Sequence, residues 1–127
     1  MIRALLILEL IVTLGGFTAL AKGEEAAFTA EQASLGERVA ERYCSQCHDR
    51  SYFEGPLYRA VQGQQAKYLL DPIQSTMPQD RPGTLKPRHT AALLAWIMSL
   101  NGVASGDKSL PKNYDQLSNL ILPKPKA

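Results

Sequence analysis

Apolar residues at helical spacing predict an amphipathic helix in the first half of the chain. Leu35, Val39 and Tyr43 recur every four residues, which places their side chains on one face of a helix. Thr29 opens a capping-box pattern just before them, with a Gln three residues later, and such a pattern is typical of a helix start. We therefore predict a first helix over about residues 30–46.

A second apolar pattern predicts the last main helix. Leu93, Trp96, Ile97 and Leu100 fall on one helical face, as expected for a helix that packs against a core. The Asn-Gly pair that follows is a common stop signal. This helix is predicted over residues 87–100.

The intervening sequence predicts loops and short helices. Residues 49–63 contain a Gly-Pro pair and no sustained period, which favours a loop. A short helix is predicted over 64–70, and Asp71-Pro72 resembles the start of another. Residues 78–87 contain three prolines and a glycine, which indicates an irregular, rigid loop. Because no segment has the strand period, the predicted fold class is all-α.

The N-terminal residues indicate export. Arg3 precedes an apolar run that ends in small residues, Ala19-Leu20-Ala21, and this order is typical of a secretory signal peptide. We predict a signal peptide at 1–21 and a periplasmic mature protein. Glu9 interrupts the apolar run, so an uncleaved N-terminal membrane anchor stays open as the alternative. No later segment is long and apolar enough to span a membrane, so no stable membrane insertion is expected after cleavage.

The remaining sequence has the length of one domain. We predict a flexible lead over 22–29, a domain over 30–102 and a C-terminal extension over 103–127 that packs on the domain or trails from it. Within this extension, residues 114–122 could form one more short helix. The chain has 14 basic and 12 acidic residues, for a net charge of +2. This near balance, without a glycine-rich phosphate loop, gives no indication of nucleic-acid binding.

The segment Cys44-Ser45-Gln46-Cys47-His48 has the spacing at which two thiols and an imidazole bind one haem. Each thiol can add to a haem vinyl group to give a thioether, and the adjacent imidazole is then presented to the iron. These are the only two cysteines of the chain, so no cysteine is left to form a stabilising disulfide. We predict one haem c, covalently attached through Cys44 and Cys47 and ligated by His48.

A redox dithiol and a structural zinc site are the two other interpretations of this motif. A redox dithiol normally follows a strand at a helix N-terminus, whereas this motif ends a predicted helix. A structural zinc site needs four ligands, and the only other soft candidate is His89, far along the chain.

Met77 is the predicted distal ligand. It is followed by Pro78 at the start of the rigid loop, and a thioether is a soft, neutral donor that favours Fe(II). Met98 is the competing methionine, although packing within the last helix would explain it. His89 could instead complete a pair of histidine ligands.

Taken together, these features resemble the class I c-type cytochromes over residues 33–102. The resemblance rests on Gly36-x-x-x-Ala40-x-x-x-Cys44-x-x-Cys47-His48, Gly55-Pro56, Thr76-Met77-Pro78 and Leu93-x-x-Trp96. It implies a small cytochrome c fold, with about three to five helices wrapped around the haem, in which the first and last helices cross at Gly36 and Trp96. Ala40 stands where an aromatic residue is usual, so a looser crossing is expected.

The resemblance also implies that the backbone carbonyl of Pro56 holds the second ring nitrogen of His48, although a simple turn proline is the alternative. The 77–85 stretch and the Leu-Asn-Gly at 100–102 are similar to those of the small cytochromes that partner quinoprotein alcohol dehydrogenases. We expect the cofactor to complete the core, so that the cofactor-free chain is largely unfolded.

The expected function is that of a soluble, monomeric, periplasmic one-electron carrier and not an enzyme. It would accept electrons from a periplasmic dehydrogenase and pass them to another cytochrome or a terminal oxidase. With both axial positions filled by protein, no position is open for oxygen or peroxide. The alternatives are a haem c subunit of a dehydrogenase complex, a peroxidase-like enzyme in which Met77 leaves the iron, and a gas-binding sensor with the same open position.

Overall fold

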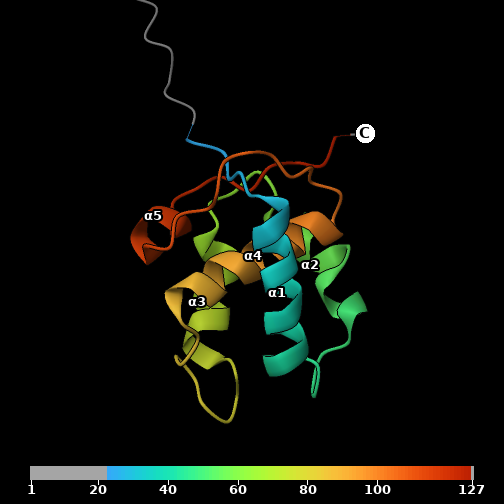
Figure 1. Ribbon diagram of the computed structural model, residues 1–127, viewed down its shortest axis with the longest axis vertical. Coiled ribbons are helices and arrows are strands. Elements are labelled where there is room, and N and C mark those ends of the chain that lie inside the picture. Colours follow the sequence, from blue (N-terminus) through green and yellow to red (C-terminus); the bar gives the residue numbers. More distant parts are fainter. Residues whose placement is uncertain (1–22, 127) are drawn as a thin grey trace, which may run out of the picture.

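The computed structural model describes residues 23–126 (Figure 1). The elements, in order, are α1 (Ala30–Tyr43), the 3₁₀ helix η1 (Arg50–Phe53), α2 (Pro56–Val61), α3 (Lys67–Thr76), α4 (Pro87–Leu100) and α5 (Tyr114–Ser118). The described residues contain no strand, only isolated β-bridges at Ile121. The all-α fold class is therefore confirmed, while the predicted signal peptide at 1–21 lies outside the described residues.

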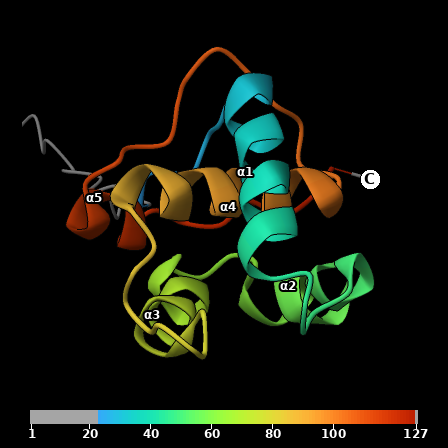
Figure 2. The ribbon, with the colours of Figure 1, turned by 60° about the horizontal axis from the view of Figure 1, so that its bottom comes forward.

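Helices α1 and α4 form the packed centre of the molecule and cross at a steep angle (Figure 2). A Cβ atom at Gly36 would lie 1.9 Å from the carbonyl oxygen of Ala92 and 2.7 Å from the Cβ of Trp96. Only a glycine allows two backbones to approach this closely. The predicted crossing at Gly36 and Trp96 is confirmed, and Ala40, buried on α1, is accommodated within it.

Helix α4 is the most deeply buried element, since every residue from Thr90 to Met98 is buried. A helix that is apolar on all sides belongs in a core. Its N-terminus begins at Pro87, which suits the first helical position because that N–H has no helical partner. Its C-terminus is closed by Asn101, whose side chain donates to the carbonyls of Ile97 and Phe53 at 2.8 and 2.9 Å.

Several predicted boundaries were wrong. Helix α1 ends at Tyr43 and the haem-type motif forms the turn after it, where the prediction continued the helix to residue 46. The segment 49–63 is not a continuous loop, because Gly55 adopts φ +69° and lets α2 begin at Pro56. A Gly-Pro pair thus marks a helix start here and not a break.

Helix α3 is one continuous helix, where the sequence predicted a short helix and a second start at Asp71. Pro72 lies inside it and removes one backbone hydrogen bond. Leu69, Leu70 and Ile73 lie against the core on one side of this helix. Burying these side chains together outweighs the lost bond. The irregular loop predicted over 78–87 is confirmed up to the start of α4.

The two terminal segments pack on this framework. Phe28 and Ala26 are buried, and the backbone N–H of Ala26 donates to the carbonyl of Ile121 at 2.8 Å. This packing differs from the flexible lead expected over 22–29, because Phe28 finds an apolar partner surface that the local sequence does not contain. The C-terminal segment, defined as residues 103–126, packs on the domain through Leu110, Leu117 and Leu122.

Candidate functional site

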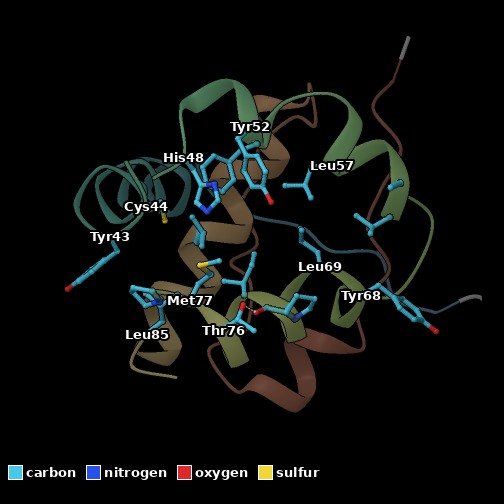
Figure 3. Close-up of a pocket in the computed structure, with 17 residues that line it drawn as sticks. Tyr43, Cys44, His48, Tyr52, Leu57, Tyr68, Leu69, Thr76, Met77 and Leu85 are labelled. Carbon is cyan, nitrogen blue, oxygen red and sulfur yellow. Dashed lines mark hydrogen bonds between the residues drawn. The ribbon is translucent and has the colours of Figure 1, made fainter. Parts of the chain in front are cut away.

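A pocket of about 300 Å³ separates the end of α1 and η1 from α2 and α3 (Figure 3). Most of the side chains around it are apolar: Tyr43, Tyr52, Phe53, Leu57, Ala60, Val61, Tyr68, Leu69, Pro72, Ile73, Pro78, Leu85 and Leu93. The remaining lining residues are Cys44, His48, Thr76 and Met77. Its volume is in the range of pockets that hold small molecules and cofactors.

The turn after α1 brings His48 to this pocket. The N–H groups of Cys47 and His48 donate to the carbonyl of Cys44 at 3.1 and 2.9 Å. The half-buried His48 ring stacks on Tyr52, with 4.3 Å between ring centroids, and meets the edge of Phe53 at 6.0 Å. These aromatic contacts orient the imidazole, and neither was expected from the sequence.

The two thiols differ in their surroundings. Cys44 is half-buried and lines the pocket, whereas Cys47 is exposed and does not. Burial raises the pKa of the Cys44 thiol, so this group is protonated at neutral pH. Both cysteines are free thiols and not a disulfide.

Met77 lies across the pocket from His48 and comes from a different element. It is the residue that ends α3, where its N–H donates to the Ile73 carbonyl at 2.9 Å. Its side chain points into the pocket toward the His48 ring (Figure 3). Residues far apart in the sequence thus present one imidazole and one thioether to the same space.

The other two distal candidates lie elsewhere. Met98 is fully buried in the core cluster, as its position in α4 predicts. His89 packs beside Tyr43, with 6.0 Å between ring centroids, and does not line the pocket. Burial, together with neighbouring Arg88, Lys86 and Arg42, lowers the pKa of His89.

Pro56 is exposed at the first position of α2 and does not line the pocket. The contacts of the His48 ring described above involve aromatic rings. The hydrogen bond from His48 to the Pro56 carbonyl therefore stays a prediction.

Comparison with known proteins does not assign a family or a function to this chain. No family model matches the chain, and no curated protein or solved structure matches it. Within residues 23–126, no three His, Cys, Asp or Glu side chains gather in a way that could hold a metal ion. In the same stretch no helix has the length and apolar character needed to cross a membrane.

The donor set of the pocket fits a haem c. One imidazole and one thioether facing each other across an apolar space are the axial ligands of haem in electron-transfer cytochromes. The thiol of Cys44 lines the same pocket, and that of Cys47 belongs to the same turn.

Sequence reasoning did not identify Tyr52, Phe53 and Tyr68 as part of the pocket. Tyr52 and Phe53 follow the haem-type motif within five residues, and that proximity could have singled them out. Tyr68 has no such signal, since its place depends on how α3 packs.

Proposed function

We propose that this chain is a periplasmic one-electron carrier with one haem c. The cofactor would be attached through Cys44 and Cys47 and ligated by His48 and Met77. The observation that supports this most is the convergence of Cys44, His48 and Met77 on one apolar pocket. The Cys-x-x-Cys-His spacing supports covalent attachment of the haem.

When bound, the haem supplies the Fe(III)/Fe(II) couple. The residues of the chain set its surroundings. Stacking on Tyr52 holds the His48 ring in one orientation, and the mostly apolar lining disfavours water in the pocket interior. The neutral thioether of Met77 favours the reduced state and so raises the reduction potential.

A basic surface adjoins this pocket and supports a protein partner with an acidic face. Arg38 and Arg42 of α1 lie around one groove with Lys86 and Arg88 at the start of α4. Within the described part of the chain none of these four side chains forms an ion pair. Tyr43 lines both the groove and the pocket. An acidic partner at this surface would therefore approach the redox centre closely.

By this proposal the partners are redox proteins of the periplasm. A dehydrogenase would donate the electron, and another cytochrome or a terminal oxidase would accept it. Quinoprotein alcohol dehydrogenases are the candidate donors that the resemblance favours. Electrostatic docking predicts that the rate of electron transfer falls steeply as salt is added.

Mass spectrometry of the exported protein tests the proposal. The full chain should be expressed with its own N-terminal segment in a host that has haem-maturation machinery. We expect the mass of the polypeptide plus one haem, and a haem that acid-acetone does not extract. A purified protein with the mass of the bare polypeptide would contradict the proposal.

Two substitutions sharpen this test. Cys44→Ala and Cys47→Ala each remove one thioether, so each variant should retain its haem less firmly in acid-acetone. Ser45→Ala is the matched control, because it changes the same turn and leaves both thiols.

A further inference from the structure

Helices α2 and α3 form the wall of the pocket that carries Met77. They supply nearly half of its lining residues but make few contacts with α1 and α4, which pack extensively against each other. Figure 2 shows α2 and α3 on one side of the α1–α4 pair. Other contacts must therefore contribute to the position of this wall, and the C-terminal segment supplies several of them.

The first set of contacts fixes the turn between α2 and α3. The N–H of Leu122 donates to the carbonyl of Gln64 at 2.8 Å, and the N–H of Gly63 donates to the carbonyl of Leu122 at 2.7 Å. This pair of backbone hydrogen bonds joins the C-terminal segment to the point where the two helices meet.

Two tyrosine hydroxyls then attach the same segment to each helix separately. The hydroxyl of Tyr58 on α2 donates to the carbonyl of Pro123 at 2.8 Å. The hydroxyl of Tyr114, the first residue of α5, donates to a carboxylate oxygen of Asp71 in α3 at 2.5 Å. Hydrogen bonds to a charged acceptor are the stronger kind.

Asp71 and Met77 belong to one rigid unit. Helix α3 continues from Asp71 to Thr76 without interruption and ends at Met77, whose N–H completes the last turn on Ile73. A contact that fixes Asp71 therefore restricts where the Met77 thioether can go.

We propose that Tyr114 is a positioning residue for the distal ligand. Its hydrogen bond to Asp71 holds α3 where Met77 faces His48 across the pocket. The inference rests on the proposed function, since it assigns to Tyr114 a role in keeping Met77 on the iron. The C-terminal segment, residues 103–126, would then help to keep Met77 on the iron. This segment lies outside residues 33–102, the region that the resemblance covers.

Imidazole binding to the holoprotein tests this role, because imidazole reaches the iron only when Met77 leaves. Tyr114→Phe removes the hydroxyl and keeps the ring. We expect it to bind imidazole about threefold more tightly than the wild type, since a single hydrogen bond is worth about a factor of five in an equilibrium constant and part of it is retained by water. Asp71→Ala should have a similar effect, and the double variant should add nothing further.

Tyr58→Phe is the matched control. It removes a hydroxyl bonded to the same C-terminal segment but attached to α2, so imidazole affinity should stay at the wild-type value. Unchanged affinity in Tyr114→Phe would overturn the inference. An equal rise in Tyr58→Phe and Tyr114→Phe would also overturn it, because it would mean general loosening of the wall.

A second readout separates this inference from the proposed function. Hydrogen exchange of the α3 amides should be faster in Tyr114→Phe than in the wild type and unchanged in Tyr58→Phe. If the wild type has no covalent haem, or its haem lacks the sulfur-to-iron charge-transfer band, the proposed function fails in whole or in its Met77 part. The exchange rates still decide whether Tyr114 positions α3, and equal rates in the wild type and Tyr114→Phe would show that it does not.

Discussion

The crossing of α1 and α4 and the α2–α3 wall of the pocket are held together in different ways. At the crossing, Gly36 brings two backbones into contact and Trp96 packs beside it. The wall encloses a cavity and is attached through hydrogen bonds from the C-terminal segment. The first region depends on close packing within the chain, whereas the second borders a cavity that the proposed haem would fill. We therefore expect the crossing to be the region most sensitive to substitution, and the wall to be the region most sensitive to loss of the cofactor.

The largest effect is expected at the crossing. Gly36→Ala would place a Cβ atom 1.9 Å from the carbonyl oxygen of Ala92, so the two helices must move apart. We expect a loss of about 4 kcal/mol or more in the free energy of unfolding of the holoprotein, measured with guanidinium chloride. Gly106→Ala is the control, because nothing lies within 4 Å of a Cβ at that position. A Gly36→Ala variant as stable as wild type would show that the crossing tolerates separation.

Removing the cofactor should destabilise the whole chain, and the wall more than the crossing. Without haem, the cavity of about 300 Å³ leaves the inner faces of α2 and α3 without a partner, and we expect the chain to lose its cooperative thermal transition. Any residual protection from hydrogen exchange in the cofactor-free chain should lie in α4. The amides of α2 and α3 should exchange about tenfold faster than those of α4, or more. A cooperative transition in cofactor-free protein, with all helices equally protected, would contradict this expectation.

Asn101 connects the two regions, so its substitution tests whether they are coupled. Its side chain donates to the Phe53 and Ile97 carbonyls and accepts from the N–H of Gly55 at 2.7 Å. Asn101→Ala leaves the Phe53 carbonyl and the Gly55 N–H without this side-chain partner and should cost about 2 kcal/mol of unfolding free energy.

Asn113→Ala offers a comparison at a second asparagine. It removes only the side-chain cap of the short helix α5 and should cost about 1 kcal/mol or less. Equal losses in the two variants would mean that Asn101 acts as a cap alone and does not couple the regions.

The smallest effect concerns His89, in the first turn of α4. Burial and three nearby cations lower the pKa of His89 below its ordinary 6.5, so the unfolded chain binds this proton more readily than the folded one. The stability that this group contributes is therefore present above pH 6.5 and is lost as the pH falls through the folded-state value. Unfolding of wild type and His89→Gln at several pH values should show this slope in the wild type only.

The features that the sequence predicted correctly are those that depend on local patterns or on motifs of fixed spacing. The apolar period of α4 and the Gly36 and Trp96 pair belong to this group, as does the loop after Met77. The errors arose where distant residues decide the outcome. Phe28 is buried because remote parts of the chain cover it, and Pro72 is tolerated because α3 packs on the core as one helix. Neither effect is visible in the neighbouring sequence.

The pocket shows the same division. Cys44, His48 and Met77 could be selected by residue type and spacing, and they do line one cavity. The contact of Tyr114 with Asp71 joins residues that no local pattern relates, so only the three-dimensional structure reveals it.

The absorption spectrum of the oxidised Met77→Ala holoprotein tests the central claim most directly. In the proposed attachment the haem is held through Cys44 and Cys47, so this variant should keep its covalent haem but lose the sulfur-to-iron charge-transfer band and lower its potential. Met98→Leu, a substitution of similar volume in the core, should keep the band. If the band survives in Met77→Ala, Met77 is not the distal ligand and the account is contradicted; its loss in Met98→Leu alone would assign that role to Met98.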